Sequence, residues 1–309
     1  MIARPGTGPG KPRLTILHAD AGRCVSRGEL GTAATARAVA ILADVHGNLP
    51  ALEAVLADVI ARGITEVVVA GDLLGLGAGP NAVVDRLVDV GATLLRGNHE
   101  ADYVGGHADP ALRAAWRADP VGAALAWYLD RLGPQRIALL TALPDRHWLD
   151  PATLVTHGSA RHLRDAIRAD TPCADLAAMY AGVPARLTFS GHTHEATIRP
   201  APYGRAVNVG SVGAPLDGDP RAAYAVATRA PGAADGDWAV AIARVPYDVE
   251  AALAAYTRAM GVPDATFLAL VSRQLRTARR YVNPWLALSA TLRPDERTAA
   301  LARFLIDDT

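Results

Sequence analysis

Short apolar runs alternate with segments of helical period through the first sixty or so residues after position 36. The runs at 37–44, 65–72 and 92–98 are rich in Val, Ile, Leu and Ala, as expected of buried strands. Between them, residues 49–62 and 80–91 repeat apolar positions at helical spacing. The first of these segments stops at a glycine and the second carries a proline near its start, which are common helix boundary signals. The alternation predicts an α/β sheet that is largely parallel in this half.

The pattern changes in the rest of the chain. Residues 100–150 are expected to be helical. Further strands are expected at TLVTHG, RLTFSGH and RAVNVG, and the segments AAYAVAT and WAVAIARV alternate as an antiparallel pair would. The last sixty residues or so look helical again, with breaks at Pro284 and Pro294.

These elements predict three parts of the chain. Residues 1–36 are rich in Gly, Pro, Ala and Arg without a sustained period, and we expect a disordered leader there. Residues 37–249 are expected to form one sandwich-like domain that contains all the strands. Residues 250–309 are expected to form a C-terminal helical extension, whose apolar stripe packs against the sandwich or joins two copies as a homodimer.

Composition excludes several classes of protein. The chain has 31 Lys plus Arg and 31 Asp plus Glu, so no overall field attracts it to nucleic acid or to an anionic membrane. Its two cysteines, Cys24 and Cys173, are too few for a disulfide framework, and we expect Cys173 to be a small core residue. No apolar run approaches the ~18 residues of a membrane span, and no secretory signal is recognisable. We therefore expect a cytoplasmic protein.

Polar residues with metal-ligand chemistry recur where the predicted strands end. They are Asp44 and His46 in DVHGN, Asp72 in GD, Asn98 and His99 in GNHE, His157 in THG, and His192 and His194 in GHTH. Ligands of open α/β sheets bind outside the carboxyl ends of the strands, so these blocks are expected to converge on one edge. In extended chain, residues i and i+2 face the same side. We therefore expect Asp44 with His46, and His192 with His194, to present paired ligands.

The predicted ligand set points to a class of metal. Carboxylate, imidazole and amide donors without thiolate suit Mn, Fe, Co, Ni or Zn. There are more donors than one four-coordinate ion needs, so we expect two ions that share a bridging carboxylate, an arrangement used for displacement at phosphorus. Two divalent ions against two carboxylates leave a local charge of roughly +2, or about +1 with a bridging hydroxide. A neutral protein would thereby gain an anion site.

The order and spacing of these blocks resemble the calcineurin-like metallophosphoesterase superfamily. Its pattern is D-x-H, then GD, then GNH followed by an acid, then a single His, then GHxH, and every block is present between Asp44 and His194. The later segments NVGSVGAPLDGDPRAAYAV and RVPYD are similar to those of small bacterial phosphodiesterase-like members. The resemblance covers roughly residues 37–249. It implies a four-layer αββα sandwich of the α/β (α+β) class, which agrees with the predicted strands and helices.

The resemblance also implies roles for individual residues. One metal would be held by Asp44, His46 and His194, the other by Asn98, His157 and His192, and Asp72 would bridge the two. His99 would lie over the scissile phosphate, where it stabilises charge or protonates the leaving oxygen, and Glu100 would orient its imidazole. The implied chemistry is hydrolysis of phosphate mono- or diesters by a metal-bound hydroxide, with manganese as the expected ion and Fe, Ni, Co or Zn as alternatives.

One segment departs from the family pattern. Many small members read GD-x-x-GYGP after the bridging aspartate, whereas this chain reads GDLLGLGAGP, with Leu76 where the aromatic residue would stand. The family resemblance therefore does not extend to substrate preference.

Three classes of function remain after this comparison. The first is a phosphoesterase for a small-molecule or nucleotide substrate. The second is a non-catalytic interaction scaffold on the same fold, which would most simply lack His99 or a ligand. The third is a nuclease, against which the zero net charge counts.

Other histidines and arginines are expected to serve no catalytic role. His18, His107, His147 and His162 are read as packed or solvated side chains, and Arg96 and Arg161 as solvated rather than phosphate-binding. Arg273, Arg276 and Arg280 would share one solvated helical face, or alternatively form a patch for an anionic partner.

Overall fold

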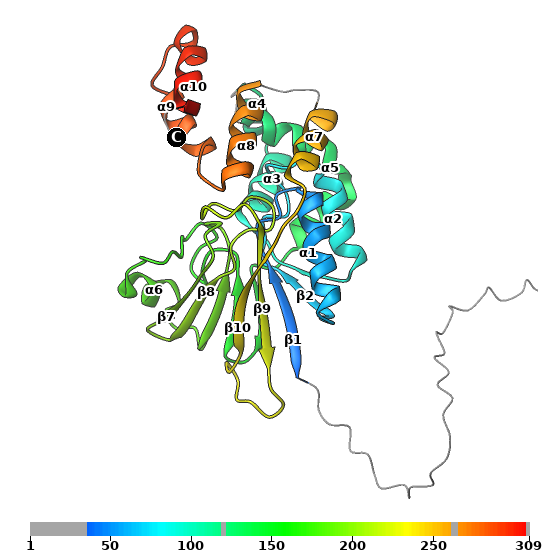
Figure 1. Ribbon diagram of the computed structural model, residues 1–309, viewed down its shortest axis with the longest axis vertical. Coiled ribbons are helices and arrows are strands. Elements are labelled where there is room, and N and C mark those ends of the chain that lie inside the picture. Colours follow the sequence, from blue (N-terminus) through cyan, green and yellow to red (C-terminus); the bar gives the residue numbers. More distant parts are fainter. Residues whose placement is uncertain (1–35, 119–121, 261–264, 307–309) are drawn as a thin grey trace, which may run out of the picture. The chain divides into compact units, whose positions relative to one another are not determined.

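The computed structural model describes residues 36–118, 122–260 and 265–306 (Figure 1). The predicted leader at 1–36, with His18 and Cys24, falls almost wholly outside the described residues. The strands form two five-stranded sheets, here called the first and the second sheet.

The first sheet has the strand order β10-β9-β1-β2-β3. Its strands are β1 (Arg37–Leu42), β2 (Glu66–Val69), β3 (Thr93–Leu94), β9 (Ala222–Arg229) and β10 (Ala239–Val245). β1, β2 and β3 are parallel, with Val39 opposite Glu66, whereas β9 runs antiparallel to both β1 and β10. The predicted parallel half and the predicted antiparallel pair are both confirmed.

The second sheet has the order β4-β5-β6-β8-β7. Its strands are β4 (Arg146–Asp150), β5 (Thr153–Thr156), β6 (Leu187–Ser190), β7 (Thr197–Ala201) and β8 (Gly204–Asn208). The three central strands β5, β6 and β8 are parallel, and an antiparallel strand flanks them on each side.

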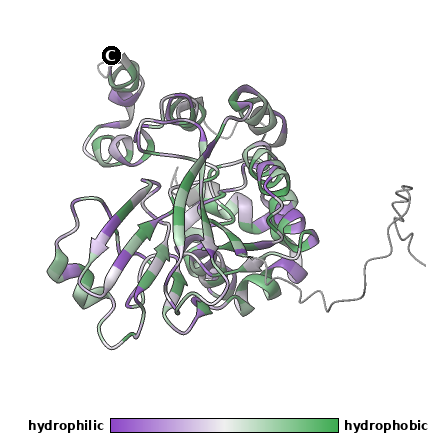
Figure 2. Ribbon diagram, turned by 60° about the horizontal axis from the view of Figure 1, so that its bottom comes forward, coloured by the Kyte–Doolittle hydropathy of each residue, from purple (hydrophilic) through white to green (hydrophobic). Residues whose placement is uncertain are grey.

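Alternation along the strands builds three apolar layers. In β1, Val39 and Ile41 face the second sheet and pack with residues such as Phe189, whereas Ala40 and Leu42 face the opposite way, toward helices. Figure 2 shows the hydrophobic residues that run along these central strands. The helices over the first sheet are α1 (Leu49–Ala61), α2 (Pro80–Asp89), α3 (Asn98–Ala108), α4 (Pro110–Ala118) and α5 (Gly122–Ala142).

A shorter helix covers the other face of the second sheet. In α6 (Cys173–Met179), Leu176 and Met179 pack on Leu154 and Ala206. Helix, sheet, sheet and helix therefore form the predicted four-layer αββα sandwich of the α/β class.

The C-terminal residues form the predicted helical extension. Its elements are α7 (Val249–Met260), α8 (Ala265–Thr277), α9 (Val282–Ser289), the 3-10 turn η1 (Pro294–Glu296) and α10 (Arg297–Ile306). They build a further apolar cluster around Leu270, Tyr281 and Trp285, which contacts the sandwich through Ala214 and Leu76. In Figure 1, α8 lies above the end of the sandwich toward which β1 points.

Several predicted details are wrong. β4 lies in a stretch expected to be helical, and β7 was not expected, because both are short edge strands with few buried residues. Pro284 does not break the C-terminal helices but lies in the first turn of α9, where no N–H is needed for an intrahelical bond. Cys173 is exposed rather than a core residue, because it begins α6 ahead of the turns that reach the sheet.

No helix in the described parts of the chain combines the length and the apolar character needed to cross a membrane.

Candidate functional site

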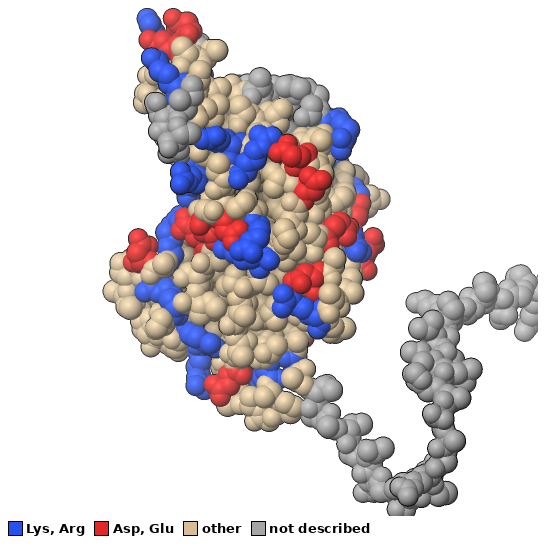
Figure 3. Space-filling view, in the orientation of Figure 1, with Lys and Arg blue, Asp and Glu red and all other residues tan. Residues whose placement is uncertain are grey.

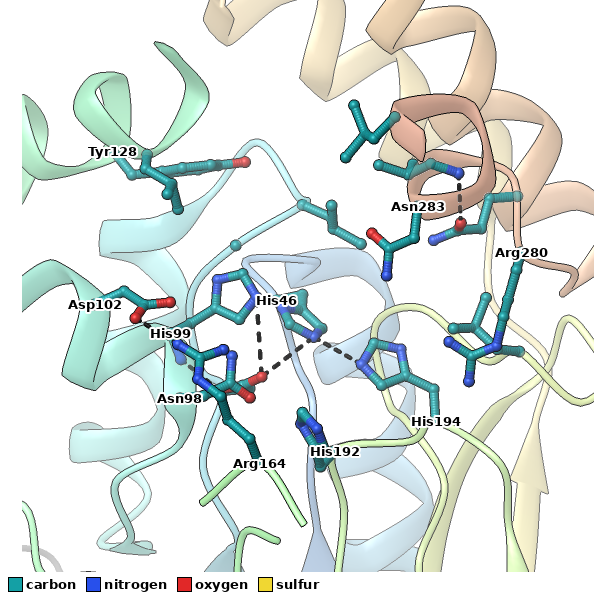
Figure 4. A pocket seen from close by; sticks show the side chains of 18 of the residues that line it. His46, Asn98, His99, Asp102, Tyr128, Arg164, His192, His194, Arg280 and Asn283 are labelled. Atoms are coloured by element: carbon teal, nitrogen blue, oxygen red, sulfur yellow. Dashed lines mark hydrogen bonds and ion pairs between the residues drawn. The ribbon is translucent and has the colours of Figure 1, made fainter. Parts of the chain in front are cut away.

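The sequence-predicted ligands lie together at the carboxyl ends of the parallel strands of both sheets (Figure 4). Asp44 and His46 follow β1, and Asp72 follows β2, in the first sheet. His157 follows β5 in the second sheet. The GHTH segment follows β6, and the GNHE segment begins α3 just after β3. The expected convergence of these blocks on one edge is therefore found.

A first cluster of donor atoms joins the two sheets. His46 Nε2 lies 3.0 Å from His194 Nε2, and Asp44 Oδ1 lies 3.4 Å from His194 Nε2 and 3.8 Å from His46 Nε2. All three side chains are buried. The carboxylate and the two imidazoles thus surround one point.

A second cluster lies beside the first. His157 Nε2 is 3.0 Å from Asn98 Oδ1 and 3.4 Å from Asp72 Oδ2. His192 completes it, with its ring centroid 5.2 Å from that of His157. Asp72 Oδ2 is also 3.8 Å from His46 Nε2 in the first cluster. The Asp72 carboxylate therefore stands between the two groups of donors.

Three of the histidines are oriented by the backbone. The Nδ1 atoms of His46, His157 and His194 lie 3.0, 2.8 and 2.6 Å from the carbonyl oxygens of Leu74, Ala70 and Ala214. Because a carbonyl only accepts, each Nδ1 must carry the proton and donate it. In the neutral ring, the Nε2 lone pair then faces the cluster, which is the tautomer a metal ligand needs.

The paired ligands do not adopt the extended backbone that was expected. Asp44, His46, Asp72, His192 and His194 have φ between 50° and 68°, in the left-handed region, and Ala278 is the one other non-glycine residue of the described chain with positive φ. The prediction of paired ligands from extended chain is thus wrong in its geometry, although the ligands do meet. Such φ values are costly for residues with a side chain and concentrate at functional sites.

Two glycines permit the close approach of the loops. The backbone of Gly71, at φ 82°, packs directly on Gly97, and a Cβ at Gly97 would lie 2.2 Å from Asp72 Oδ1. A side chain at Gly97 would therefore displace the shared carboxylate.

Glu100 supports this loop and not the His99 imidazole. Its buried carboxylate accepts hydrogen bonds from the backbone N–H groups of Asp72 (2.8 Å), Leu73 (2.9 Å) and Gly97 (2.8 Å). The expectation that Glu100 orients the His99 ring does not agree with these contacts, because adjacent residues of a helix point in different directions. Burial and the nearby charge of Asp72 raise the pKa of Glu100 to about 7.

His99 borders the open side of the site. Its backbone N–H donates to Asp72 Oδ1 at 2.9 Å, and its Nε2 lies 4.0 Å from Asp72 Oδ2. Its ring meets that of His46 edge to face, with centroids 4.9 Å apart. Within the described residues its Nδ1 has no hydrogen-bond partner, so the ring is oriented less firmly than those of His46, His157 and His194.

Electrostatics within the clusters oppose the effect of burial on the pKa at Asp44 and His157, but not at His46. Burial would raise the pKa of Asp44, but the imidazoles of His194 and His157 lower it. Burial would lower the pKa of His157, yet the adjacent Asp72 carboxylate raises it to about 10. Burial, with the charge of His194, lowers the pKa of His46 to about 3. A cation that binds His157 must therefore displace a proton.

Some supporting residues were not found from the sequence. Asn208, at the end of β8, donates to the carbonyl of Gly191 at 2.7 Å and to Thr193 Oγ1 at 2.8 Å, and so fixes the GHTH loop. Asn48 caps α1 and donates to the carbonyl of Gly213 at 2.8 Å. In the sequence, these two residues could have been found only because Asn48 ends the DVHGN segment and Asn208 begins the NVG segment.

The two clusters open into a cavity of about 440 Å³. Arg164 and Arg280 line it, although the former was not singled out in the sequence and the latter was assigned to a solvated helical face. Arg280 lies beyond the last residue of α8, so it does not share that helical face. Arg161 instead pairs with Asp165 at 2.8 Å, and Arg96 pairs with Asp145 at 2.8 Å. Both of these arginines are thus engaged in ion pairs away from the cavity.

The donor atoms fit divalent cations. The Nε2 lone pairs of His46 and His194, 3.0 Å apart, repel each other unless a proton or a cation lies between them. About 3.0 Å is also the separation of two nitrogens bound at right angles ~2.1 Å from one ion. Within the described chain, the buried Asp44 Oδ1 accepts no hydrogen bond. Carboxylate, imidazole and amide donors without thiolate suit Mn, Fe, Co, Ni or Zn.

Comparison with known proteins identifies the class. Residues 38–230 match the family model described as the calcineurin-like phosphoesterase superfamily domain, and the chain belongs to that superfamily. The resemblance noted in the sequence is thereby confirmed. Membership supports a metal-dependent phosphoester hydrolase in general, and the family typically binds divalent metals.

Individual relatives cover most of the chain. An uncharacterized protein of Methanocaldococcus jannaschii is 26% identical over 233 residues, which are 69% of this chain and 89% of the relative. The crystal structure of a metallophosphoesterase from Sphaerobacter thermophilus is 28% identical with a TM-score of 0.60, and the match covers 78% of this chain and 99% of that one. A hypothetical protein from Pyrococcus horikoshii shares the fold, with 20% identity, a TM-score of 0.64 and coverage of 76% and 97%.

Proposed function

We propose that this protein hydrolyses phosphate mono- or diesters of a small molecule or nucleotide with two divalent cations. Asp44, His46 and His194 would hold one cation, and Asn98, His157 and His192 the other. The observation that carries the proposal is the Asp72 carboxylate, whose Oδ2 lies 3.4 Å from His157 Nε2 and 3.8 Å from His46 Nε2, between the two donor groups.

Two cations at this position would polarise the phosphoryl oxygens and lower the pKa of the attacking water. The chain itself supplies the remaining functions. The carbonyls bonded to Nδ1 of His46, His157 and His194 hold these rings in place, so little reorganisation is needed during reaction. His99, at the open side, would donate a proton to the leaving oxygen. Glu100 positions Asp72 through its backbone.

The cavity supports a small substrate. A volume of about 440 Å³ falls in the range of small-molecule sites. On the face of the described residues seen in Figure 3, arginine and acidic side chains adjoin in several separate groups, and no continuous basic groove of the kind expected of a nuclease is visible. A non-catalytic scaffold gains no support, because every proposed ligand and His99 are present. The proposal also includes manganese as the ion, a cytoplasmic location and a homodimer formed through the C-terminal helices.

Metal removal and replacement tests this function. Protein treated with a chelator should hydrolyse neither 4-nitrophenyl phosphate nor bis(4-nitrophenyl) phosphate, and manganese should restore hydrolysis of at least one of them. Elemental analysis of the active protein should find about two ions per chain. Asp85→Ala, which removes a carboxylate from an exposed ion pair with Arg136, is the control and should change neither result. Full activity in protein free of divalent metal would refute the proposal.

A further inference from the structure

The cavity beside the two donor clusters has a second wall, made by the C-terminal helices. α8 contributes Phe267 and Gln274, α9 contributes Val282, Asn283 and Leu286, and the turn between these helices contributes Arg280. Leu76, which stands where many family members have an aromatic residue, packs on this part of the chain. A segment outside the residues matched by the family model therefore reaches the candidate site.

The turn after α8 presents Arg280 in a defined way. Ala278, at φ 51°, ends the helix, and its N–H donates to the carbonyl of Gln274 at 2.8 Å. The buried Gln274 side chain then accepts the N–H of Tyr281 at 3.2 Å, just before α9 begins. The backbone on both sides of Arg280 is thus fixed, and its guanidinium lies beside His194 in Figure 4.

The contacts of Arg280 leave charge and donors available. Its Nη2 donates to the carbonyl of Thr193 at 2.8 Å and to Glu195 Oε1 at 2.8 Å. Glu195 also pairs with Arg168, so one carboxylate lies between two guanidinium groups and a positive charge remains. Within the described residues, Nε and Nη1 of Arg280 have no hydrogen-bond partner, although the side chain is only 34% exposed.

The rest of the cavity differs in character. On the side of α3, Arg164 pairs with Asp102 at 2.6 Å, which balances its charge. The lining also includes the apolar side chains of Leu76, Phe267 and Leu286. The candidate site therefore combines a place for a phosphoryl group, apolar side chains and, beside His194, a cationic group with unused donors.

We propose that Arg280 binds a second anionic group of the substrate while Phe267 and Leu286 pack against its apolar part. The substrate is then a phosphate ester whose alcohol portion carries an apolar or aromatic body and an additional carboxylate or phosphate. This inference rests on the proposed function, which places the reacting phosphoryl group at the donor clusters. Arg280 determines specificity and does not take part in the chemical step.

Binding of a graded series of four anions to the manganese-loaded full chain tests the inference. Inorganic phosphate probes the donor clusters, phenylphosphonate adds the aromatic body, and 3- and 4-carboxyphenylphosphonate add the second anion. The phosphonates contain a C–P bond that is not hydrolysed, so calorimetry measures their affinity without turnover. We expect affinity to rise roughly tenfold at each addition, for at least one of the two carboxyl isomers.

Matched variants assign each increment to its residue. Arg280→Met should abolish the gain from the carboxylate and leave the affinities for phosphate and phenylphosphonate within about threefold of wild type. Arg280→Lys, which keeps the charge, should retain part of the gain. Phe267→Ala should reduce the gain from the ring. Arg276→Met, which breaks the 2.7 Å ion pair with Glu250 outside the cavity, is the control and should change none of the affinities.

Other outcomes would overturn the inference. A uniform loss of affinity for all ligands in Arg280→Met, together with a lower Tm, would make Arg280 a structural clamp on the Thr193 carbonyl. Equal affinity of wild type for phenylphosphonate and both carboxyphenylphosphonates would remove the second anion site while leaving the proposed hydrolase intact. A wild-type chain that binds no manganese and cleaves no ester would instead refute the proposed function, and this inference with it.

Discussion

Replacing Gly97 by alanine should damage the candidate metal site through a single methyl group. Gly97 precedes α3 with φ −99° and ψ −176°, a conformation that alanine adopts without strain. The effect of the substitution is therefore steric. The added Cβ would lie 2.2 Å from Asp72 Oδ1 and 2.4 Å from Asp72 N, so the backbone and the carboxylate of Asp72 must both move.

The size of the effect follows from these contacts. A carbon atom tolerates neighbours at about 3.4 Å, so Asp72 must retreat by roughly 1 Å in a fully buried loop. Overpacking of this kind costs about 1–3 kcal/mol, which corresponds to a fall in Tm of roughly 2–10 °C in a domain of this size. Metal–ligand distances tolerate only about 0.2 Å, so manganese affinity should fall by roughly 100-fold or more.

Gly105 provides the matched control. It lies in the same helix, and a Cβ there would meet no atom within 4 Å. Gly105→Ala should raise the free energy of unfolding by up to about 1 kcal/mol, because alanine favours the helix, and should leave manganese binding unchanged. Both variants would be compared with wild type by thermal unfolding of chelated protein and by calorimetric titration with manganese.

Normal manganese affinity in Gly97→Ala would refute this reasoning. It would mean either that Asp72 is not a ligand or that the loop yields more readily than its buried hydrogen bonds to Glu100 suggest. Thermal unfolding separates the two explanations. An unchanged Tm indicates a yielding loop, whereas a lowered Tm with intact binding removes Asp72 from the ligand set.

Two further predictions concern single side chains. His99→Ala should keep its bound metal while kcat falls by roughly 10²–10⁴, whereas Asp72→Ala should lose metal. Elemental analysis would measure the bound metal and steady-state kinetics would measure kcat. Parallel loss of metal in both variants would make His99 a ligand. Burial alone would raise the pKa of Asp150, but donors led by the Trp238 indole, at 2.6 Å, lower it. Asp150→Asn should therefore lower the free energy of unfolding by about 1–3 kcal/mol near neutral pH. Chemical unfolding should show that the difference in this free energy between wild type and variant shrinks as the pH falls below about 4, where the wild-type carboxylate becomes protonated. A difference that stays constant with pH would contradict the role of the charge.

The sequence predicted the architecture because strand and helix periods alternate where the parallel strands lie. The edge strands β4 and β7 were not predicted, and the reason is physical. Each is five residues long and half exposed, so neither carries the apolar run that marks a buried strand. In β7, Pro200 further weakens the signal, since proline is tolerated only where a ladder bond is dispensable.

The ligand positions could be predicted because each follows a strand whose end lies at the shared edge. Their backbone conformation could not, because spacing in sequence carries no information on the sign of φ. The left-handed turn at His46 depends on hydrogen bonds to the loop after β2, such as His46 N–H to the carbonyl of Asp72 at 3.0 Å.

The sequence also did not predict that α8 and α9 form a wall of the candidate site. Helical period identifies an apolar face but not the surface that it covers. Nothing in the local pattern indicates that Arg280 contacts the carbonyl of Thr193, 87 positions earlier.

The placement of the donors across two sheets has a thermodynamic consequence. His46 follows a strand of the first sheet and His194 a strand of the second, 148 positions apart in sequence and 3.0 Å apart at their Nε2 atoms. A cation held by both would act as a cross-link between the sheets that the unfolded chain cannot form. Ligand at 100 times its Kd stabilises a fold by about 2.7 kcal/mol. The supply of metal would then determine the fraction of the protein that stays folded and resists proteolysis. This effect would be separate from any effect of the metal on the catalytic rate.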